Sequence, residues 1–182
     1  MANYWQKRAY AELSTDPSDL AKRGLVYLLA QFFDVGASSS VSFVLETNGQ
    51  EVQFEFYDLT SVDLPVRAVL IEGPTYTKFG PAITARNLNR NFPDTHTSTL
   101  SSASAISGGV VIASELIGAG TKAGGVFSTS RVHILKNDTD YVMTFHNADN
   151  QTSRCHINLG WSEGEPERYR LVRQIQNTSG TT

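Results

Sequence analysis

Four histidines, His96, His133, His146 and His156, are the first residues of the chain that could bind a metal or transfer a proton. No two of them form the His-x-His or His-x3-His spacing that places two ligands side by side. His133 and His146 fall on strands that we predict to be neighbours, so a metal site between them is one interpretation. The other is that all four are ordinary surface or half-buried imidazoles.

The remaining candidates for catalysis are weaker. Cys155, the single cysteine, alternates with core residues, which indicates a small apolar filler rather than a nucleophile, and it excludes an internal disulfide. No Gly-x-Ser-x-Gly elbow is present. Glu163 and Glu165 are close in sequence, but no two carboxylates are marked as facing each other across a cleft. We therefore predict no enzymatic activity, no cofactor and no metal.

A run of asparagines and arginines in the middle of the chain is the most unusual stretch. Asn87, Asn89 and Asn91 occupy every second position, and Arg86, Leu88 and Arg90 occupy the alternate ones. In an extended strand the amides would point to one face and the guanidinium groups to the other. Such a strand needs hydrogen-bond partners across a sheet or a subunit boundary. A polar loop with two solvated arginines is the alternative, and both interpretations stay open.

Composition limits the classes of partner. A length of 182 residues fits one domain, and 40% apolar residues are enough for a core, whereas charged residues make up only 18%. The net charge is −3 and no basic run occurs, so nucleic acid is not an expected partner. The first residues lack an apolar signal core, and no apolar run approaches the roughly 20 residues that cross a bilayer. We expect a soluble protein made in a cytoplasm, with no membrane partner.

The elements that would position these side chains begin with an arm, residues 1–23. It carries Tyr4, Trp5 and Tyr10 among polar residues. The segment Asp16–Asp19, with a proline at its second position, predicts a short helix that ends near Arg23. Residues 25–33 are apolar on both faces and fit either a continuing helix or a buried strand, and the glycines at both ends favour the strand.

Strands are predicted through the rest of the chain. Residues 41–46 and 51–56 alternate around Asn48-Gly49, which is typical of a β-hairpin. Further strands are expected at residues 66–72, 110–117, 131–135, 141–146 and 155–162. Glycine-proline pairs bound a turn and a loop between residues 73 and 81. Residues 93–108 are expected to form a Ser/Thr-rich connector that contains part of an edge strand.

The last of these strands has the clearest pattern, because Cys155, Ile157, Leu159 and Trp161 share one face. Beyond it, residues 164–182 form a charged tail that includes Arg168 and Arg170. About eight short strands with Gly/Asn turns predict an all-β, antiparallel sandwich or barrel over residues 24–163.

Several motifs then occur in an order that resembles a family of small virion proteins from tailed bacteriophages. The family shows a strand that ends in Glu-Gly, a Thr-x-x-Asn-x-Asn-Arg-Asn run, an Ile-Leu-Lys-x-x-Thr-x-Tyr strand pair and a terminal Trp-Tyr-Glu-like strand. The matching segments of this chain are residues 70–75, 83–84 with 87–91, 117–120, 134–141 and 159–163. The chain departs from the pattern at Ser162, where an aromatic residue is usual, and in its C-terminal extension.

The resemblance, which covers residues 66–163, implies a jelly-roll-like fold and a decoration or cement protein on the capsid surface of the virion. The implied partners are the major capsid protein and further copies of the chain, with a trimer expected. We predict that the arms and the Asn/Arg run form the capsid or subunit interface: Tyr4, Trp5, Tyr10, Arg86, Asn87, Asn89, Arg90, Asn91, Arg168 and Arg170. The alternative function is a receptor- or glycan-binding module on a fibre or tail, with exposed aromatics in loops at Tyr76–Phe79 or Gly118–Gly125.

Overall fold

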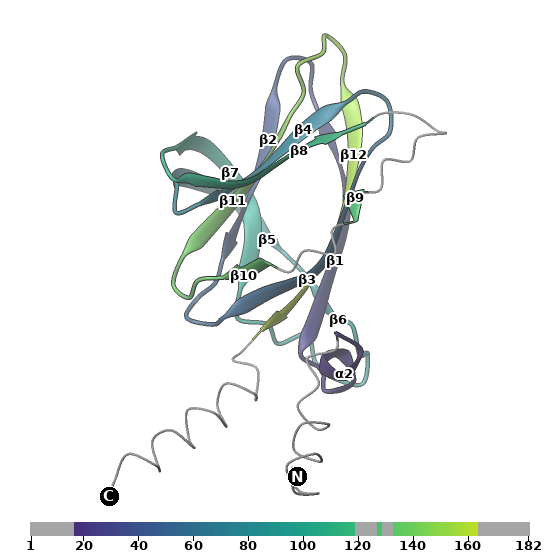
Figure 1. Cartoon of the computed structure of the whole chain (residues 1–182), viewed down its shortest axis with the longest axis vertical. Coiled ribbons are helices and arrows are strands. Elements are labelled where there is room, and N and C mark those ends of the chain that lie inside the picture. Colours follow the sequence, from purple (N-terminus) through teal and green to yellow (C-terminus); the bar gives the residue numbers. More distant parts are fainter. Residues whose placement is uncertain (1–16, 119–126, 129–132, 164–182) are drawn as a thin grey trace, which may run out of the picture.

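Two antiparallel sheets face each other in the computed structural model, which describes residues 17–118, 127–128 and 133–163 (Figure 1). Within these residues a short helix, α2 (Pro17–Lys22), precedes the first strand. The strands are β1 (Val26–Val35), β2 (Ser40–Glu46), β3 (Val52–Ser61), β4 (Val66–Glu72), β5 (Thr75–Ile83), β6 (Arg86–Asn87), β7 (Thr99–Ser107), β8 (Val110–Ile117), β9 (Phe127–Ser128), β10 (His133–Leu135), β11 (Asp140–His146) and β12 (Ser153–Glu163). The predicted all-β antiparallel sandwich is therefore confirmed.

The strand order pairs the first strands of the described chain with its last ones. The first sheet, here called sheet A, has the order β10-β3-β12-β1-β6, with β9 also paired to β3. The second, sheet B, has the order β5-β7-β2-β11-β4-β8. The first strand thus pairs with the last in sheet A, and the second pairs with the second-last in sheet B. This alternation is compatible with the jelly roll that the resemblance implies.

The core fills the space between the sheets with large side chains. Trp161 and Phe145 are fully buried, and Phe33 and Phe43 pack edge-on against Phe145 with ring centroids 4.7 and 6.1 Å away. The apolar face predicted for β12 is confirmed, since all four of its residues are at most 1% exposed. Aromatic pairs of this geometry add stabilisation beyond burial of their area.

The N-terminal predictions are also confirmed within the described residues. The helix begins at Pro17, and the ambiguous apolar run is strand β1. Gly24 lies at the junction with φ of 72°, a conformation that glycine adopts without strain. The aromatic part of the arm and the whole C-terminal tail lie outside the described residues. No helix of the described chain is long and apolar enough to cross a bilayer.

The predicted hairpin around Asn48-Gly49 is wrong. Both turn residues have the expected positive φ, 49° and 81°, but β2 belongs to sheet B and β3 to sheet A. The turn is a corner between the sheets rather than a hairpin. The buried Thr47 holds this corner, because its hydroxyl contacts the backbone oxygens of Lys136 and Thr139 and accepts the Thr139 N–H.

The region between Gly73 and Ser107 also differs from the prediction. Residues 75–83 form strand β5 rather than a turn and a loop, and β7 lies between β5 and β2, so it is not an edge strand. The described residues therefore hold twelve strands rather than about eight. Tyr76 of β5 and Ile106 of β7 pack on Val44 and Val142, which form a cluster separate from the main core.

Candidate functional site

The Asn/Arg run is a turn, not a strand, beyond its first two residues. Only Arg86 and Asn87 pair with β1. The Oδ1 of Asn87 accepts the N–H of Asn89 at 2.9 Å, and the Oδ1 of Asn89 accepts the N–H of Asn91 at 3.1 Å. Asparagine forms such turns because its side chain reaches the backbone two residues on. The spacing of two therefore comes from successive turns, so of the two interpretations left open by the sequence the structure favours a polar loop beyond Asn87.

These amides also tie the loop to the start of the sandwich. Asn87 is 1% exposed, and its Nδ2 donates to the backbone oxygens of Gly24 at 2.8 Å and Pro93 at 3.3 Å. The Nδ2 of Asn89 donates to the oxygen of Lys22 at 3.0 Å, at the end of α2. The partners that the sequence required are therefore present within the same chain.

Asp94 binds both arginines of the run. Arg86 donates to its Oδ2 and Arg90 to its Oδ1, each at 2.8 Å, and the backbone N–H of Asn87 also donates to Oδ1 at 2.6 Å. The hydrogen bond from Arg86, followed by that from Asn87, lowers the pKa of Asp94 well below its ordinary value. Both arginine side chains are 64% exposed, so solvent screens the two ion pairs.

Glu163, the last residue of β12, is the second anchor of this end of the sandwich. Its Oε2 accepts the N–H and the hydroxyl of Thr97 at 2.7 and 2.8 Å. Its Oε1 accepts the N–H of Ser98 and the indole N–H of Trp161, each at 3.0 Å, together with the Ser98 hydroxyl. Burial raises the pKa of Glu163, but the bonds from Ser98, Thr97 and Trp161 outweigh it and lower this pKa below its ordinary value.

Aromatic rings fill the space beside these carboxylates. The ring of His96 lies edge-on to Tyr27 and Trp161, at centroid distances of 5.5 and 6.0 Å, and the Tyr27 hydroxyl donates to the oxygen of Thr95 at 3.2 Å. We call Asn87, Asn89, Asp94, Ser98 and Glu163 the end network. This network joins α2, β1, β6 and β12, so its immediate effect is to hold together the two ends of the folded chain.

Of the predicted interface residues, the structure places only those in the Asn/Arg run. It brings Arg86, Asn87 and Arg90 together around Asp94, and Asn89 and Asn91 follow in the turns that Asn87 begins. Their role between subunits stays a prediction. The others lie outside the described residues: Tyr4, Trp5, Tyr10, Arg168 and Arg170. Sequence reasoning missed Asp94 and Ser98 altogether. Asp94 could have been found from its position four residues after Arg90, a spacing at which an ion pair can form. No pattern distinguishes Ser98 from the many other serines.

The histidines do not form the metal site that we considered. His133 lies in sheet A opposite Phe54, whereas His146 lies in sheet B opposite Ser40 and Arg67, so the two are not neighbours. The described residues contain no group of three or more side chains that could hold a metal ion. The Nδ1 of His146 lies 2.9 Å from the Ser40 hydroxyl on an exposed face.

A second group of acidic residues lies at one end of sheet B. Tyr76 donates to Asp140 at 2.8 Å and to Glu46 at 3.3 Å, and Lys78 pairs with Glu46 at 2.6 Å. Burial and the bond to Asp140 raise the pKa of Tyr76. Burial raises the pKa of Glu46, but the bonds from Lys78 and Thr99 lower it overall. Like the end network, this group uses its carboxylates to fix strands.

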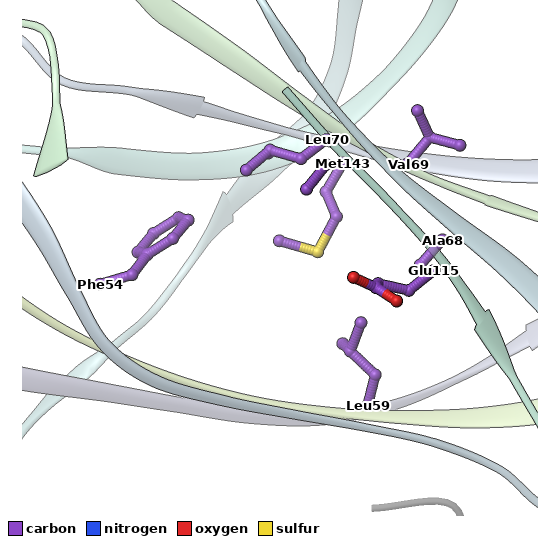
Figure 2. A pocket seen from close by; sticks show the side chains of 8 residues that line it. Phe54, Leu59, Ala68, Val69, Leu70, Glu115 and Met143 are labelled. Carbon is purple, nitrogen blue, oxygen red and sulfur yellow. The ribbon is translucent and has the colours of Figure 1, made fainter. Parts of the chain in front are cut away.

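A small cavity of about 30 Å³ lies between β3 and strands β4, β8 and β11 (Figure 2). Phe54, Leu59 and Met143 line it, and Figure 2 shows the carboxylate of Glu115 directed toward Leu59 and Met143. Such a volume holds a water molecule, whereas pockets for small-molecule ligands span about 300–1,000 Å³. The cavity therefore does not admit a substrate.

A larger groove of about 450 Å³ lies on sheet B, where β7 turns toward β8. Hydroxyl groups make up much of its wall, and no charged side chain lines it. Its hydroxyl residues are Ser40, Ser42, Ser104, Ser107 and Thr144. Val69, Ile71 and Ile106 supply apolar contacts. Hydroxyls over an aliphatic floor suit a neutral ligand rich in hydrogen-bonding groups.

Large apolar side chains are exposed on three edge or near-edge strands. Leu116 on β8 is 73% exposed, Ile134 on β10 is 57% exposed and Phe79 on β5 is 54% exposed. These strands lie at the ends of their sheet orders. Exposed apolar groups on sheet edges are typical of contacts with other chains.

Comparisons with known proteins add little to this geometry. No protein-family model matches the chain, and no curated protein sequence matches it. Among solved structures, the chain is similar to a hydroquinone 1,2-dioxygenase from Sphingomonas sp. TTNP3, crystallised with 4-hydroxybenzoate bound, at 9% identity and a TM-score of 0.31. The match covers 77% of this chain and 62% of the dioxygenase, and a likeness this distant carries no functional argument.

Proposed function

We propose that the chain is a structural protein of a tailed-bacteriophage virion, a decoration or cement protein that binds the capsid shell. The first support is the ordered set of motifs within residues 66–163 that resembles such proteins. The second is the fold class, since a two-sheet antiparallel sandwich is compatible with the jelly roll, an architecture found in capsid and lectin domains.

One observation of the molecule carries the proposal: exposed apolar side chains lie on sheet edges around a filled core. Leu116, Ile134 and Phe79 are all more than half exposed. The carboxylates of Asp94 and Glu163 are meanwhile used for internal hydrogen bonds. A body of this kind suits binding through its surface rather than chemistry in a cleft.

In this proposal the aromatic arm makes the contact with the major capsid protein. Tyr4, Trp5 and Tyr10 supply large contact areas of the type found at interface hot spots. Several copies in one assembly would raise the overall strength of binding, because each further contact forms within a complex that already exists.

Co-sedimentation with capsids tests the proposal. Shells of the cognate phage prepared without the chain are mixed with the full chain or with a variant that lacks residues 2–15. We expect the full chain to sediment with the shells, and the variant to stay folded but remain in the supernatant. Failure of the full chain to bind contradicts the capsid proposal. Equal binding by the variant contradicts the role of the arm.

The hydroxyl-lined groove favours a second candidate, a glycan-binding module of a fibre or tail. The loop at Tyr76–Phe79 that this alternative invoked is part of β5, and only Phe79 of these two aromatics is largely exposed. Calorimetric titration with host-surface polysaccharide tests the alternative. Binding that is lost when Ser104→Phe fills the groove supports it, whereas absence of binding contradicts it.

A further inference from the structure

The outer face of sheet B carries an arginine with no acidic partner in the part of the chain that the structure describes. Arg67 lies on β4 and is exposed, and its Nε donates to the Ser114 hydroxyl on β8 at 3.1 Å. None of the described ion pairs includes Arg67. The bond to Ser114 orients the guanidinium group and leaves its two terminal nitrogens for another group. A planar guanidinium group binds a carboxylate through two parallel hydrogen bonds.

A histidine and a serine continue the row that this arginine begins. His146 on β11 pairs with Arg67 on one side and with Ser40 on the other. Residues directly opposite each other in a sheet have Cβ atoms about 4.5–5.5 Å apart. The Nδ1 of His146 lies 2.9 Å from the Ser40 hydroxyl, so Nε2 carries the proton when that hydroxyl donates. We call Arg67, His146 and Ser40 the polar row, because their exposed side chains present hydrogen-bond donors on one line.

The polar row is continuous with the hydroxyl-lined groove of sheet B. Ser40 belongs to both. On β4, Val69 lines the groove two residues after Arg67. On β11, Thr144 lines it two residues before His146. Side chains two residues apart on a strand point to the same face, so the row and the groove form one site.

A β-bulge in β7 supplies the apolar part of this site. Between Ser104 and Ser107, β7 has one residue more than the stretch of β5 that it pairs with. Ala105 lies in this bulge with φ of 52°, which is uncommon for a residue other than glycine. Bulges change the direction of side chains near binding sites. Here the next residue, Ile106, lines the groove together with Ile71.

We propose that this site binds an acidic sugar, a carboxylated hexose unit of a polysaccharide. The sugar ring lies in the groove, and its carboxylate lies on Arg67 and His146. The groove volume of about 450 Å³ falls within the range of about 300–1,000 Å³ for small-molecule sites. Serine and threonine hydroxyls match the hydroxyls of a sugar, and the aliphatic side chains match its C–H groups. No charged side chain lines the groove, so the charge of the ligand is bound at the polar row.

Charges elsewhere on the same face determine how such a ligand is oriented. Glu46 and Asp140 lie opposite each other at the ends of β2 and β11 that are farthest from the polar row. Tyr76 donates a hydrogen bond to each of them. A negatively charged ligand is repelled by these carboxylates and attracted by Arg67. This complementarity of charge selects an acidic sugar over a neutral one.

The inference deepens the glycan-binding candidate and rests on it, because it names the class of sugar for the same groove. It is independent of the capsid proposal, since it involves no contact with a shell. The experiment therefore has to separate a groove that prefers acidic sugars from a groove that binds any sugar, and both from a groove that binds none.

Two glycosides that differ in one group provide this separation. Methyl β-D-glucuronoside has a carboxylate where methyl β-D-glucoside has a hydroxymethyl group. Each is titrated into the full chain, and binding is followed in nitrogen–proton correlation NMR spectra. We expect the glucuronoside to shift the amide signals of the residues that line the groove. Its Kd should be lower than that of the glucoside by about tenfold, because charge-assisted hydrogen bonds are stronger than neutral ones.

Two matched variants locate the charge that makes the difference. Arg67→Gln removes the guanidinium group of the polar row, and it should bind both glycosides with the same weak affinity. Arg154→Gln removes the same charge from an arginine of sheet A whose side chain is 62% exposed, and it should keep the preference of the wild type. Circular dichroism spectra of both variants should match that of the wild type.

The outcomes distinguish the inference from the candidate on which it rests. A preference for the glucuronoside that Arg67→Gln loses and Arg154→Gln keeps supports the proposal. Equal affinities of the wild type for the two glycosides overturn the acidic-sugar inference but leave the groove as a glycan site. No shift with either glycoside contradicts both. Sodium acetate is the control for the ring, and shifts as large with acetate as with the glucuronoside also overturn the proposal.

Discussion

Replacement of Glu163 by glutamine keeps the size of the side chain but removes the charge that five donors surround. The carboxylate accepts bonds from Thr97, Ser98 and Trp161 with both of its oxygens. An amide retains one acceptor oxygen, and its NH2 group then faces donors. At least one of the two backbone N–H groups that it caps therefore loses its acceptor.

The magnitude follows from the type of bond lost. A hydrogen bond to a charged group contributes about 1.5–3 kcal/mol, and Thr97 is exposed enough for water to replace part of its bond. We therefore expect Glu163→Gln to lower the free energy of unfolding by about 2–3 kcal/mol. For a chain of this size that corresponds to a fall in Tm of about 4–12 °C.

The pH dependence has a definite sign. The pKa of Glu163 is lower in the folded chain than its ordinary value of 4.5. The folded state therefore binds this proton less readily than the unfolded state, and the stabilisation is fully present above pH 4.5. It is lost as the pH falls through the lowered pKa. The difference in unfolding free energy between wild type and Glu163→Gln should shrink accordingly.

Urea unfolding of both proteins at neutral and at acidic pH is the assay. Glu51→Gln is the control, since it removes the same charge from a partly exposed carboxylate that precedes β3. We expect Glu51→Gln to remain within about 0.5 kcal/mol of wild type. Equal midpoints for wild type and Glu163→Gln, or a difference that does not change with pH, would refute the reasoning.

Three further predictions concern other parts of the sandwich. Asn87→Ala should lower the free energy of unfolding, measured in urea, by about 2–3 kcal/mol, because it breaks buried hydrogen bonds to two backbone carbonyls. The control Asn91→Ala, at an exposed site, should lower it by less than about 0.5 kcal/mol. Equal losses would contradict the buried role of Asn87. Gly109→Ala should lower Tm more than Gly80→Ala does. Both glycines have positive φ, so both substitutions strain the backbone, but only at Gly109 would the new Cβ also lie 2.7 Å from a backbone oxygen of β4. Burial raises the pKa of the Cys155 thiol, so it should react with a thiol reagent only as the protein unfolds, and rapid labelling of the native chain would count against the packing.

The sequence predicted the strands whose two faces differ. In β12 every second residue from Cys155 to Trp161 is apolar, and only one assignment buries that face. β1 was assigned from its flanking glycines. Such patterns indicate which side chains of a strand are buried, and this can be read from the local sequence alone.

The errors arise where the outcome depends on distant partners. Asn48 and Gly49 determined the shape of a turn, but not which sheet the next strand would join. β5 shows no alternation and includes Gly80-Pro81, because a strand at the end of a sheet tolerates a proline. The pairing of strands across the sandwich therefore could not be predicted from local pattern.

The candidate site shows the same limit. The sequence identified Asn87 and its neighbours as unusual and showed that their amides need partners. Two regular spacings, one from strand alternation and one from successive asparagine turns, give the same sequence pattern. The contact with Asp94 distinguishes the two, because Arg86 and Arg90 both bind its carboxylate, as the turns allow.

The most direct test of the central claim is a cryo-electron-microscopy reconstruction of the tailed-phage particle whose genome encodes this chain. The proposal predicts regularly spaced copies of the two-sheet sandwich on the outer surface of the capsid shell. Absence of the chain from purified particles, or its presence only on a fibre or tail, would contradict the assignment as a capsid decoration protein.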